Sequence, residues 1–306
     1  MDTKPIDFNP PTDEAPVILL PVKASLFADR ADRFIGLADD HSLSEWLVFL
    51  AHLSRAQQKA LQNLPELPLP NGTALDQARQ HGMPPLNTTA IERPAAWRSV
   101  LREIIDQLMP QAGEATRALM QALRDADDAH LDRLADELLS GEIDRAKSGE
   151  LPFIAAALQV VWTSLASRLD ATHLQKLDTP GVCPCCGSLP VASVVRLSPT
   201  VNNLRYLHCS LCNTEWNLAR AVCTHCNGDK GLAYQQLEGE KARNPEAMRA
   251  ETCDSCKSYL KIAYQDKDPR VDPVADDIAT LALDLLVDEA GYSRSGPNLF
   301  LIGGAA

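Results

Sequence analysis

Eight of the nine cysteines of this chain form four Cys-x-x-Cys pairs, and all four pairs fall between residues 183 and 256. The pairs are Cys183/Cys186, Cys209/Cys212, Cys223/Cys226 and Cys253/Cys256. Two residues between cysteines allow one tight turn to direct both thiols at the same ion, and two such turns complete a tetrahedron. Four pairs in one short region therefore predict two metal sites with four cysteine ligands each.

The order of the pairs favours sequential grouping. Site 1 would then hold Cys183, Cys186, Cys209 and Cys212, and site 2 would hold Cys223, Cys226, Cys253 and Cys256. Each group encloses a pair of strand-like runs, as in a zinc ribbon or a rubredoxin. An interleaved cross-brace stays open as the alternative, in which residues 213–222 would connect two different sites.

The residues around the pairs predict how each turn is built. Pro184 fixes the entry into the first turn, and Gly187 permits a positive φ after it; Asn227 or Gly228 would have that role at site 2. Cys185 lies inside the first turn, which is too tight to direct three sulfurs at one ion, so we expect that it does not bind the metal. The alternative is that it exchanges with a ligand cysteine or is a peroxide-sensitive thiol. His208 and His225 neighbour cysteines and could replace a ligand, but with four cysteines available per site we expect them beside the sites or at the surface.

The spacing alone favours structural zinc over redox-active iron, because most sites with four cysteine ligands are closed and stabilise a small domain. A thioredoxin-like mechanism is disfavoured because no βαβ pattern surrounds the pairs, and neither common ferredoxin spacing is present. The chain also contains no Gly-rich phosphate loop, no Gly-x-Ser-x-Gly and no His-Glu-x-x-His motif. The sequence therefore indicates a binding protein and not an enzyme.

Composition restricts the partners and the compartment. With 306 residues and 45% hydrophobic residues, the chain is long enough for two or three soluble domains. Its net charge of −12 argues against nucleic acid as a partner. The polar start at residues 1–5 is unlike a signal peptide, and the apolar run at 16–22 is too short to insert into a membrane. Because the cysteines cluster instead of forming a disulfide framework, we expect a reducing, cytoplasmic location.

Helical patterns dominate after an extended, Pro-rich leader at residues 1–23. The expected helices cover 42–61, 94–109, 114–139 with one interruption, and 152–165, with connections at 64–70 and 81–87. Ser42 and Glu45 predict a capping box at the start of the first of these. Tryptophans and leucines recur at helical spacing, which favours a core over a cofactor site. The acidic pairs Asp39/Asp40, Asp127/Asp128 and Asp276/Asp277 are interpreted as solvated helix faces.

The pattern changes at Asp178–Gly181 to short strands at 193–197, 204–208, 231–234, 251–252 and 258–264, with a turn at 198–203. A last helix at 273–289 should pack one apolar face across the metal region or on the helical domain; that face comprises Val274, Ile278, Leu281, Leu285 and Leu286. The predicted fold is a multidomain α plus small β protein. It has an all-α helical domain at 1–178, a first rubredoxin-like or zinc-ribbon module at 179–220, and a second such module with a C-terminal helix at 221–306.

Three cysteine-rich segments also carry a resemblance. They read CPCCGSLPVAS at 183–193, RYLHCSLC at 205–212 with Glu215 and Trp216 after it, and ETCDSCKSYLK at 251–261. Together with Arg33-Phe34, Leu37-Ala38 and Ala56-Gln57 in the helical half, they resemble the formate dehydrogenase accessory protein family, FdhE. The resemblance covers most of the chain. Cys185 departs from the family pattern, which leaves the choice of ligands in that turn open.

The resemblance implies a cytoplasmic assembly factor for respiratory, molybdenum- or tungsten-containing formate dehydrogenases. Such a factor would bind the catalytic subunit before export without being a subunit of the finished enzyme. The family is associated with rubredoxin-like iron, so both iron and zinc stay open as the metal, since both accept tetrahedral thiolates. Two other functions also stay open: a rubredoxin-like electron carrier that acts on the dehydrogenase or its cofactor, and a purely structural zinc-ribbon interaction protein.

Overall fold

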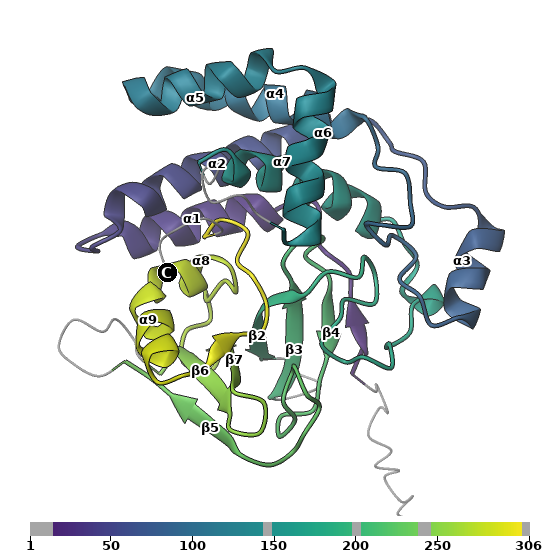
Figure 1. Ribbon diagram of the computed structural model, residues 1–306, viewed down its shortest axis with the longest axis vertical. Helices are drawn as coiled ribbons and strands as arrows, with labels where there is room; N and C mark the ends of the chain where they lie inside the picture. Colours follow the sequence, from purple (N-terminus) through teal and green to yellow (C-terminus); the bar gives the residue numbers. More distant parts are fainter. Residues whose placement is uncertain (1–14, 143–148, 198–202, 238–245, 302–306) are drawn as a thin grey trace, which may run out of the picture.

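A computed structural model of the chain describes residues 15–142, 149–197, 203–237 and 246–301. Helices form the upper layers of the molecule in Figure 1, and a mixed sheet forms the lower layer. The predicted fold class is confirmed, because a helical N-terminal part precedes a sheet-containing part that carries two groups of four cysteines. The limits of the three predicted domains stay a prediction.

The helical part contains seven α-helices within the described residues. They are α1 (Leu26–Ala38), α2 (Ser44–Asn63), α3 (Gly72–Gln80), α4 (Ala96–Leu108), α5 (Glu114–Asp125), α6 (Asp128–Ser140) and α7 (Leu151–Ala166). α1 packs along α2, and α7 packs against α2, α4 and α6. Every residue of α7 is buried, so this helix is the centre of the helical core.

Five of these helices, α2, α4, α5, α6 and α7, lie where the sequence predicts them, whereas α1 was not among the predicted ranges. The predicted interruption falls between α5 and α6, where the side chain of Asp127 caps α6 by accepting from His130 N at 2.7 Å. The predicted capping box is wrong. α2 begins at Ser44 after Leu43, with no side-chain cap, and His41 Nδ1 instead accepts from Leu43 N at 3.0 Å. α3 was not expected, because its nine residues bury none of their side chains and so show no apolar periodicity.

The strands form one continuous sheet of eight. They are β1 (Ile18–Leu19), β2 (Pro190–Arg196), β3 (Leu204–Cys209), β4 (Glu215–Asn217), β5 (Leu232–Gln235), β6 (Met248–Cys253), β7 (Ser258–Tyr264) and β8 (Ser293–Arg294). Their order is β1-β4-β3-β2-β7-β6-β5, with β8 beside β7. The two halves of the sheet join where β2 pairs in parallel with β7, through Ser193–Val195 opposite Ile262–Tyr264.

All five predicted strands are present, whereas β1, β4 and β8 were not expected. β1 lies within the predicted leader and pairs with β4, so part of that leader belongs to the sheet edge. Residues 1–14 of the leader and residues 198–202 of the predicted turn lie outside the described part of the chain. None of the helices described is long and apolar enough to span a membrane.

The predicted last helix is two helices, α8 (Ala275–Ala279) and α9 (Leu281–Glu289), which separate at Thr280. α8 packs on α1 and α2, while α9 packs on β6 and β8, so the segment contacts both the helical part and the sheet. Because of the break, the expected single apolar face does not form. Leu283 and Val287 are buried on α9, whereas Leu285 and Leu286 are more than half exposed.

The interpretation of Asp276/Asp277 as a solvated face is wrong, while Asp39/Asp40 and Asp127/Asp128 are exposed as expected. Asp276 pairs with Arg33, and Asp277 contacts Lys261 at 3.4 Å and Arg294 at 2.8 Å. Burial would raise the pKa of Asp277, but the two cations lower it below the ordinary value. These ion pairs fix α8 between α1 and the sheet. The positions of the acidic residues in the sequence do not reveal that such partners exist.

Candidate metal centres

The cysteines form two groups, and in each group the four sulfurs lie within 4.8 Å of one another. Cluster 1 contains Cys183, Cys186, Cys209 and Cys212, and cluster 2 contains Cys223, Cys226, Cys253 and Cys256. The structure thus brings the pairs together in sequential order and not as a cross-brace. It places Cys185, His208 and His225 outside both groups.

Each of the four turns is built in the same way. The residue directly after the second cysteine has a positive φ: 82° at Gly187, 58° at Asn213, 59° at Asn227 and 54° at Lys257. At three turns the amide of that residue donates to the carbonyl of the first cysteine, at 2.8 to 3.0 Å. The expected role of Gly187 is confirmed, and at cluster 2 the role belongs to Asn227.

The sulfur positions fit a tetrahedral metal ion. Metal–sulfur bonds of about 2.3 Å place the sulfurs of a tetrahedron about 3.8 Å apart. The separations are 3.6 Å for Cys183–Cys212 and 3.4 Å for Cys186–Cys209 in cluster 1, and 3.7 and 3.8 Å for the corresponding pairs of cluster 2. Each cluster could therefore hold one metal ion.

Burial disfavours the charged form of two thiols of cluster 1, and a central cation would favour it. All four thiols are buried, and burial raises the pKa of Cys183 and Cys209 well above the ordinary thiol value. A metal ion reverses this effect, because a coordinating thiol is deprotonated outright. The amides of Leu211 and Cys212 also point at the Cys209 sulfur, at 3.4 Å each, and would support its negative charge.

Cluster 1 is embedded in the helical part. The carbonyls of Cys185 and Cys186 accept from the amides of Leu86 and Thr88, at 2.9 and 3.3 Å. Trp162 of α7 donates its indole N–H to the carbonyl of Leu86 at 3.1 Å, which holds that loop on the helix. The first turn of cluster 1 is therefore fixed by a loop that is itself anchored on α7.

The second turn of cluster 1 contacts α7 directly. Gln159 donates to the carbonyl of Ser210 at 2.8 Å, and Asn213 donates to Thr163 Oγ1 at 2.8 Å. Sequence reasoning missed these positioning residues. The available signal was the presence of Gln159 and Thr163 in an otherwise apolar helix, because buried polar side chains need partners.

His208 is buried beside cluster 1 and is held on both ring nitrogens. Its Nδ1 lies 2.8 Å from Glu215 Oε1, and its Nε2 lies 3.1 Å from Asn213 Oδ1. Arg30 of α1 also donates to Asn213 Oδ1 at 3.0 Å, which extends the network into the helical part. His225 is exposed. Both histidines thus lie where the sequence analysis expected, one beside a site and one at the surface.

Cluster 2 lies nearer the surface. Cys226 is exposed and Cys256 is half-buried, in contrast to the four buried thiols of cluster 1. Cys253 is the last residue of β6, and Arg205 of β3, which is completely buried, adds side-chain contacts between cluster 2 and the other half of the sheet. Arg205 donates to Thr224 Oγ1 at 2.9 Å and pairs with Glu251 at 2.8 Å. The two clusters therefore have the same composition but differ in solvent access.

The fold and the two clusters define a class of protein in which a helical part encloses one of two four-cysteine sites on a shared sheet. Family models described as FdhE, N-terminal, FdhE, central domain, and FdhE, C-terminal domain match residues 15–179, 182–220 and 221–301. The chain is 41% identical to a protein FdhE homolog of Haemophilus influenzae over 94% of its length and 92% of the relative's. A protein FdhE homolog of Edwardsiella ictaluri is 42% identical, with the same coverage of both chains.

A solved structure agrees with these matches. The crystal structure of the FdhE protein from Pseudomonas aeruginosa has a TM-score of 0.86 and 38% sequence identity, and the match covers 95% of this chain and 100% of that one. The chain belongs to the FdhE family, which confirms the resemblance noted in its cysteine-rich segments.

Proposed function

We propose that this chain is a maturation factor that binds the catalytic subunit of a respiratory formate dehydrogenase and holds one metal ion in each cluster. The observation that carries the proposal is family membership along nearly all of residues 15–301, because the FdhE name implies an accessory role in formate dehydrogenase production. In this proposal the eight cysteines of clusters 1 and 2 are the metal ligands. Iron or zinc fits their thiolate donors.

The proposal assigns binding, and not catalysis, to the chain. The helical domain at 1–178 and the two modules at 179–220 and 221–306 would act together on the client in the cytoplasm. The net charge of −12 supports a protein client over nucleic acid, since phosphate binding favours a basic face. The metals would maintain the shape of the turns that the client meets.

Affinity capture tests the proposal. The tagged chain, with its metals and after their removal, is incubated with extracts that contain the dehydrogenase catalytic subunit. We expect retention of that subunit by the metal-loaded chain, and loss of formate dehydrogenase activity in a strain without the chain, although the subunits are still made. No retention in either metal state, together with normal activity in the deletion strain, would contradict the proposal.

A second candidate function is rubredoxin-like electron transfer. The exposure of Cys226 and the partial exposure of Cys256 favour it, because electron exchange with a partner benefits from a cluster near the surface. A visible spectrum separates the candidates. Ferric thiolate absorbs visible light and loses this absorption on reduction, whereas zinc thiolate absorbs no visible light. A colourless, fully active protein with two zinc ions would exclude electron transfer.

A further inference from the structure

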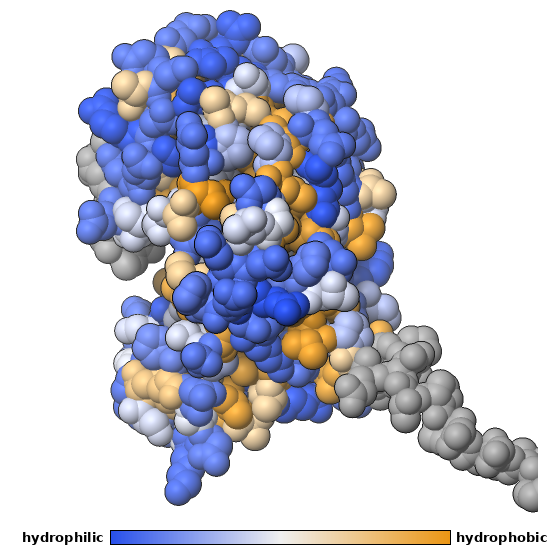
Figure 2. Space-filling model, turned by 90° about the vertical axis from the view of Figure 1, so that its right-hand side faces the viewer, coloured by the Kyte–Doolittle hydropathy of each residue, from blue (hydrophilic) through white to orange (hydrophobic). Residues whose placement is uncertain are grey.

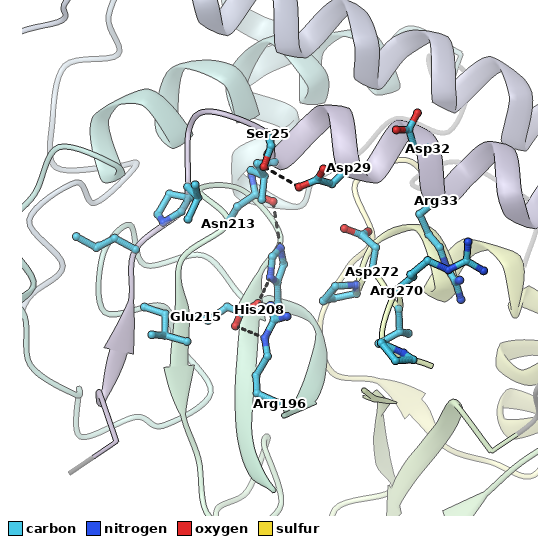
Figure 3. Close-up of a pocket in the computed structure, with 18 of the residues that line it drawn as sticks. Ser25, Asp29, Asp32, Arg33, Arg196, His208, Asn213, Glu215, Arg270 and Asp272 are labelled. Atoms are coloured by element: carbon cyan, nitrogen blue, oxygen red, sulfur yellow. Dashed lines mark hydrogen bonds and ion pairs between the residues drawn. The ribbon is translucent and has the colours of Figure 1, made fainter. Parts of the chain in front are cut away.

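A pocket of about 740 Å³ lies between α1, residues 19–22 and residues 269–273 (Figure 3). Its floor includes His208, which lies on β3, and Asn213, which lies in the second turn of cluster 1. His208 directly precedes Cys209, and Asn213 directly follows Cys212. The pocket therefore extends to the residues that flank the second turn of cluster 1, although His208 and Asn213 are at most 3% exposed.

The charged groups of the floor already have partners. Glu215 contacts His208 at 2.8 Å and accepts from Arg196 Nε at 2.9 Å. Although burial would raise the pKa of Glu215, Arg196 and His208 lower it to about 2. The carboxylate therefore stays ionised, and the Arg196 guanidinium balances its charge. Arg33 on the α1 wall is likewise paired, with Asp268 at 2.8 Å and with Asp276. The interior of the pocket consequently requires no charged ligand.

The walls of the pocket are apolar on two sides. Leu20, Val22 and Leu26 line one side, and Val271 lies across from them with prolines on either side of its loop. Val22 is 67% exposed. Figure 2 shows one face of the molecule, which is mainly hydrophilic with apolar residues in several patches. Concave apolar surfaces with a few polar groups are typical of binding sites.

The rim carries the charges that are available to a ligand. Asp29 and Asp32 lie one turn apart on α1, and both are exposed. Within the described chain, the Asp29 carboxylate has Ser25 Oγ at 2.7 Å as its partner and no cation, and Asp32 has an exposed ion pair with Arg55 at 3.3 Å. Exposed pairs of this kind contribute little and exchange readily. On the other side, the exposed Arg270 guanidinium can donate to main-chain carbonyls.

We propose that this pocket binds an extended segment of the client polypeptide, with an apolar side chain against Val22 and a basic side chain next to it at Asp29 and Asp32. The apolar walls accept the first side chain, the two carboxylates attract the second, and Arg270 holds the backbone. The proposal rests on the proposed function, since the segment belongs to the dehydrogenase catalytic subunit. It places the client beside the second turn of cluster 1.

Two variants and two matched controls test the pocket with the metal-loaded chain and the catalytic subunit. D29N/D32N removes the acidic rim, and D76N/E114Q removes two exposed acidic groups elsewhere on the helical part. V22D disrupts the apolar wall, and L286D places the same charge at a 54% exposed leucine on α9. Metal content and far-UV circular dichroism verify that each variant is folded.

We expect binding about tenfold weaker for D29N/D32N and for V22D, with both controls close to the unmodified chain. The affinity of D29N/D32N should also depend less on salt, because rim charges act through screened attraction. A photo-crosslinker at position 22 should attach to the catalytic subunit. If the unmodified chain retains the subunit while both pocket variants bind as the controls do, the pocket proposal is wrong and the proposed function stands. If the unmodified chain retains nothing, the pocket proposal is wrong, and normal activity in the deletion strain would then contradict the proposed function as well.

Discussion

Arg205→Met should destabilise the protein by about 3 kcal/mol, because it leaves Glu251 buried without its cation. Both side chains are at most 3% exposed, and the guanidinium contacts both carboxylate oxygens of Glu251, at 2.8 and 3.2 Å. Breaking such a pair costs about 3–5 kcal/mol. The lower end applies here because Tyr234 still donates to Glu251 at 2.9 Å in the variant.

Urea unfolding, followed by tryptophan fluorescence with both metals present, measures this loss. The double variant R205M/E251Q should recover most of it, since a neutral amide needs no counter-charge. Arg124→Met is the matched control: its pair with Asp106 is also short, at 2.6 Å, but both side chains are about half exposed, so the expected loss is much smaller than for Arg205→Met.

The loss should also depend on pH. Burial raises the pKa of Glu251 above its ordinary value of 4.5 even with Arg205 present. The folded state therefore holds this proton more tightly than the unfolded state, so the contribution of Glu251 to stability falls as the pH rises through the raised pKa. Without Arg205 that pKa rises further, and the loss should be larger at pH 8 than at pH 5. An equal loss at both pH values, with no recovery in the double variant, would refute the reasoning.

Three further outcomes follow from the same structure. A chelator should remove the metal ion of cluster 2 faster than that of cluster 1, because Cys226 of cluster 2 is exposed. In a Cys226→Ser variant the slowly removed ion of cluster 1 should remain; equal removal rates for the two ions would contradict this. Gly181→Ala should lower the free energy of unfolding by about 1–3 kcal/mol, since the added Cβ would lie 2.3 Å from the Thr224 carbonyl oxygen. The control Gly36→Ala, whose Cβ would meet nothing within 4 Å, should be neutral or stabilising in thermal unfolding. Cys185→Ser should retain two metal ions by elemental analysis; the loss of one would make Cys185 a ligand.

The grouping of the cysteines could be predicted from the sequence because it depends on local geometry. A Cys-x-x-Cys turn determines its own shape within five residues, and the strands between turns bring two turns together. α4 and α7 could be predicted for the same reason, because their apolar residues recur at helical spacing. Each of these elements needs information only from its immediate neighbours in the chain.

The continuity of the sheet could not be predicted, because it depends on distant residues. Ser193 pairs with Ile262 in the parallel β2–β7 contact, and nothing in either strand specifies the other. The acidic pair Asp276/Asp277 was misinterpreted for a related reason. Its carboxylates are buried only because Arg33, Lys261 and Arg294 arrive from other elements. A charged residue in sequence carries no sign of a partner that is far along the chain.

The different environments of the two clusters follow from where each lies in the fold. Cluster 1 shares a hydrophobic core with α7, and hydrogen bonds from Gln159 and Asn213 join its second turn to that helix. Opening cluster 1 therefore requires part of the helical core to open, whereas Cys226 of cluster 2 already meets solvent. One fold thus gives two sites of identical composition different solvent exposure. Any role that needs exchange of metal or electrons favours cluster 2, and any role that needs a fixed surface beside the helices favours cluster 1.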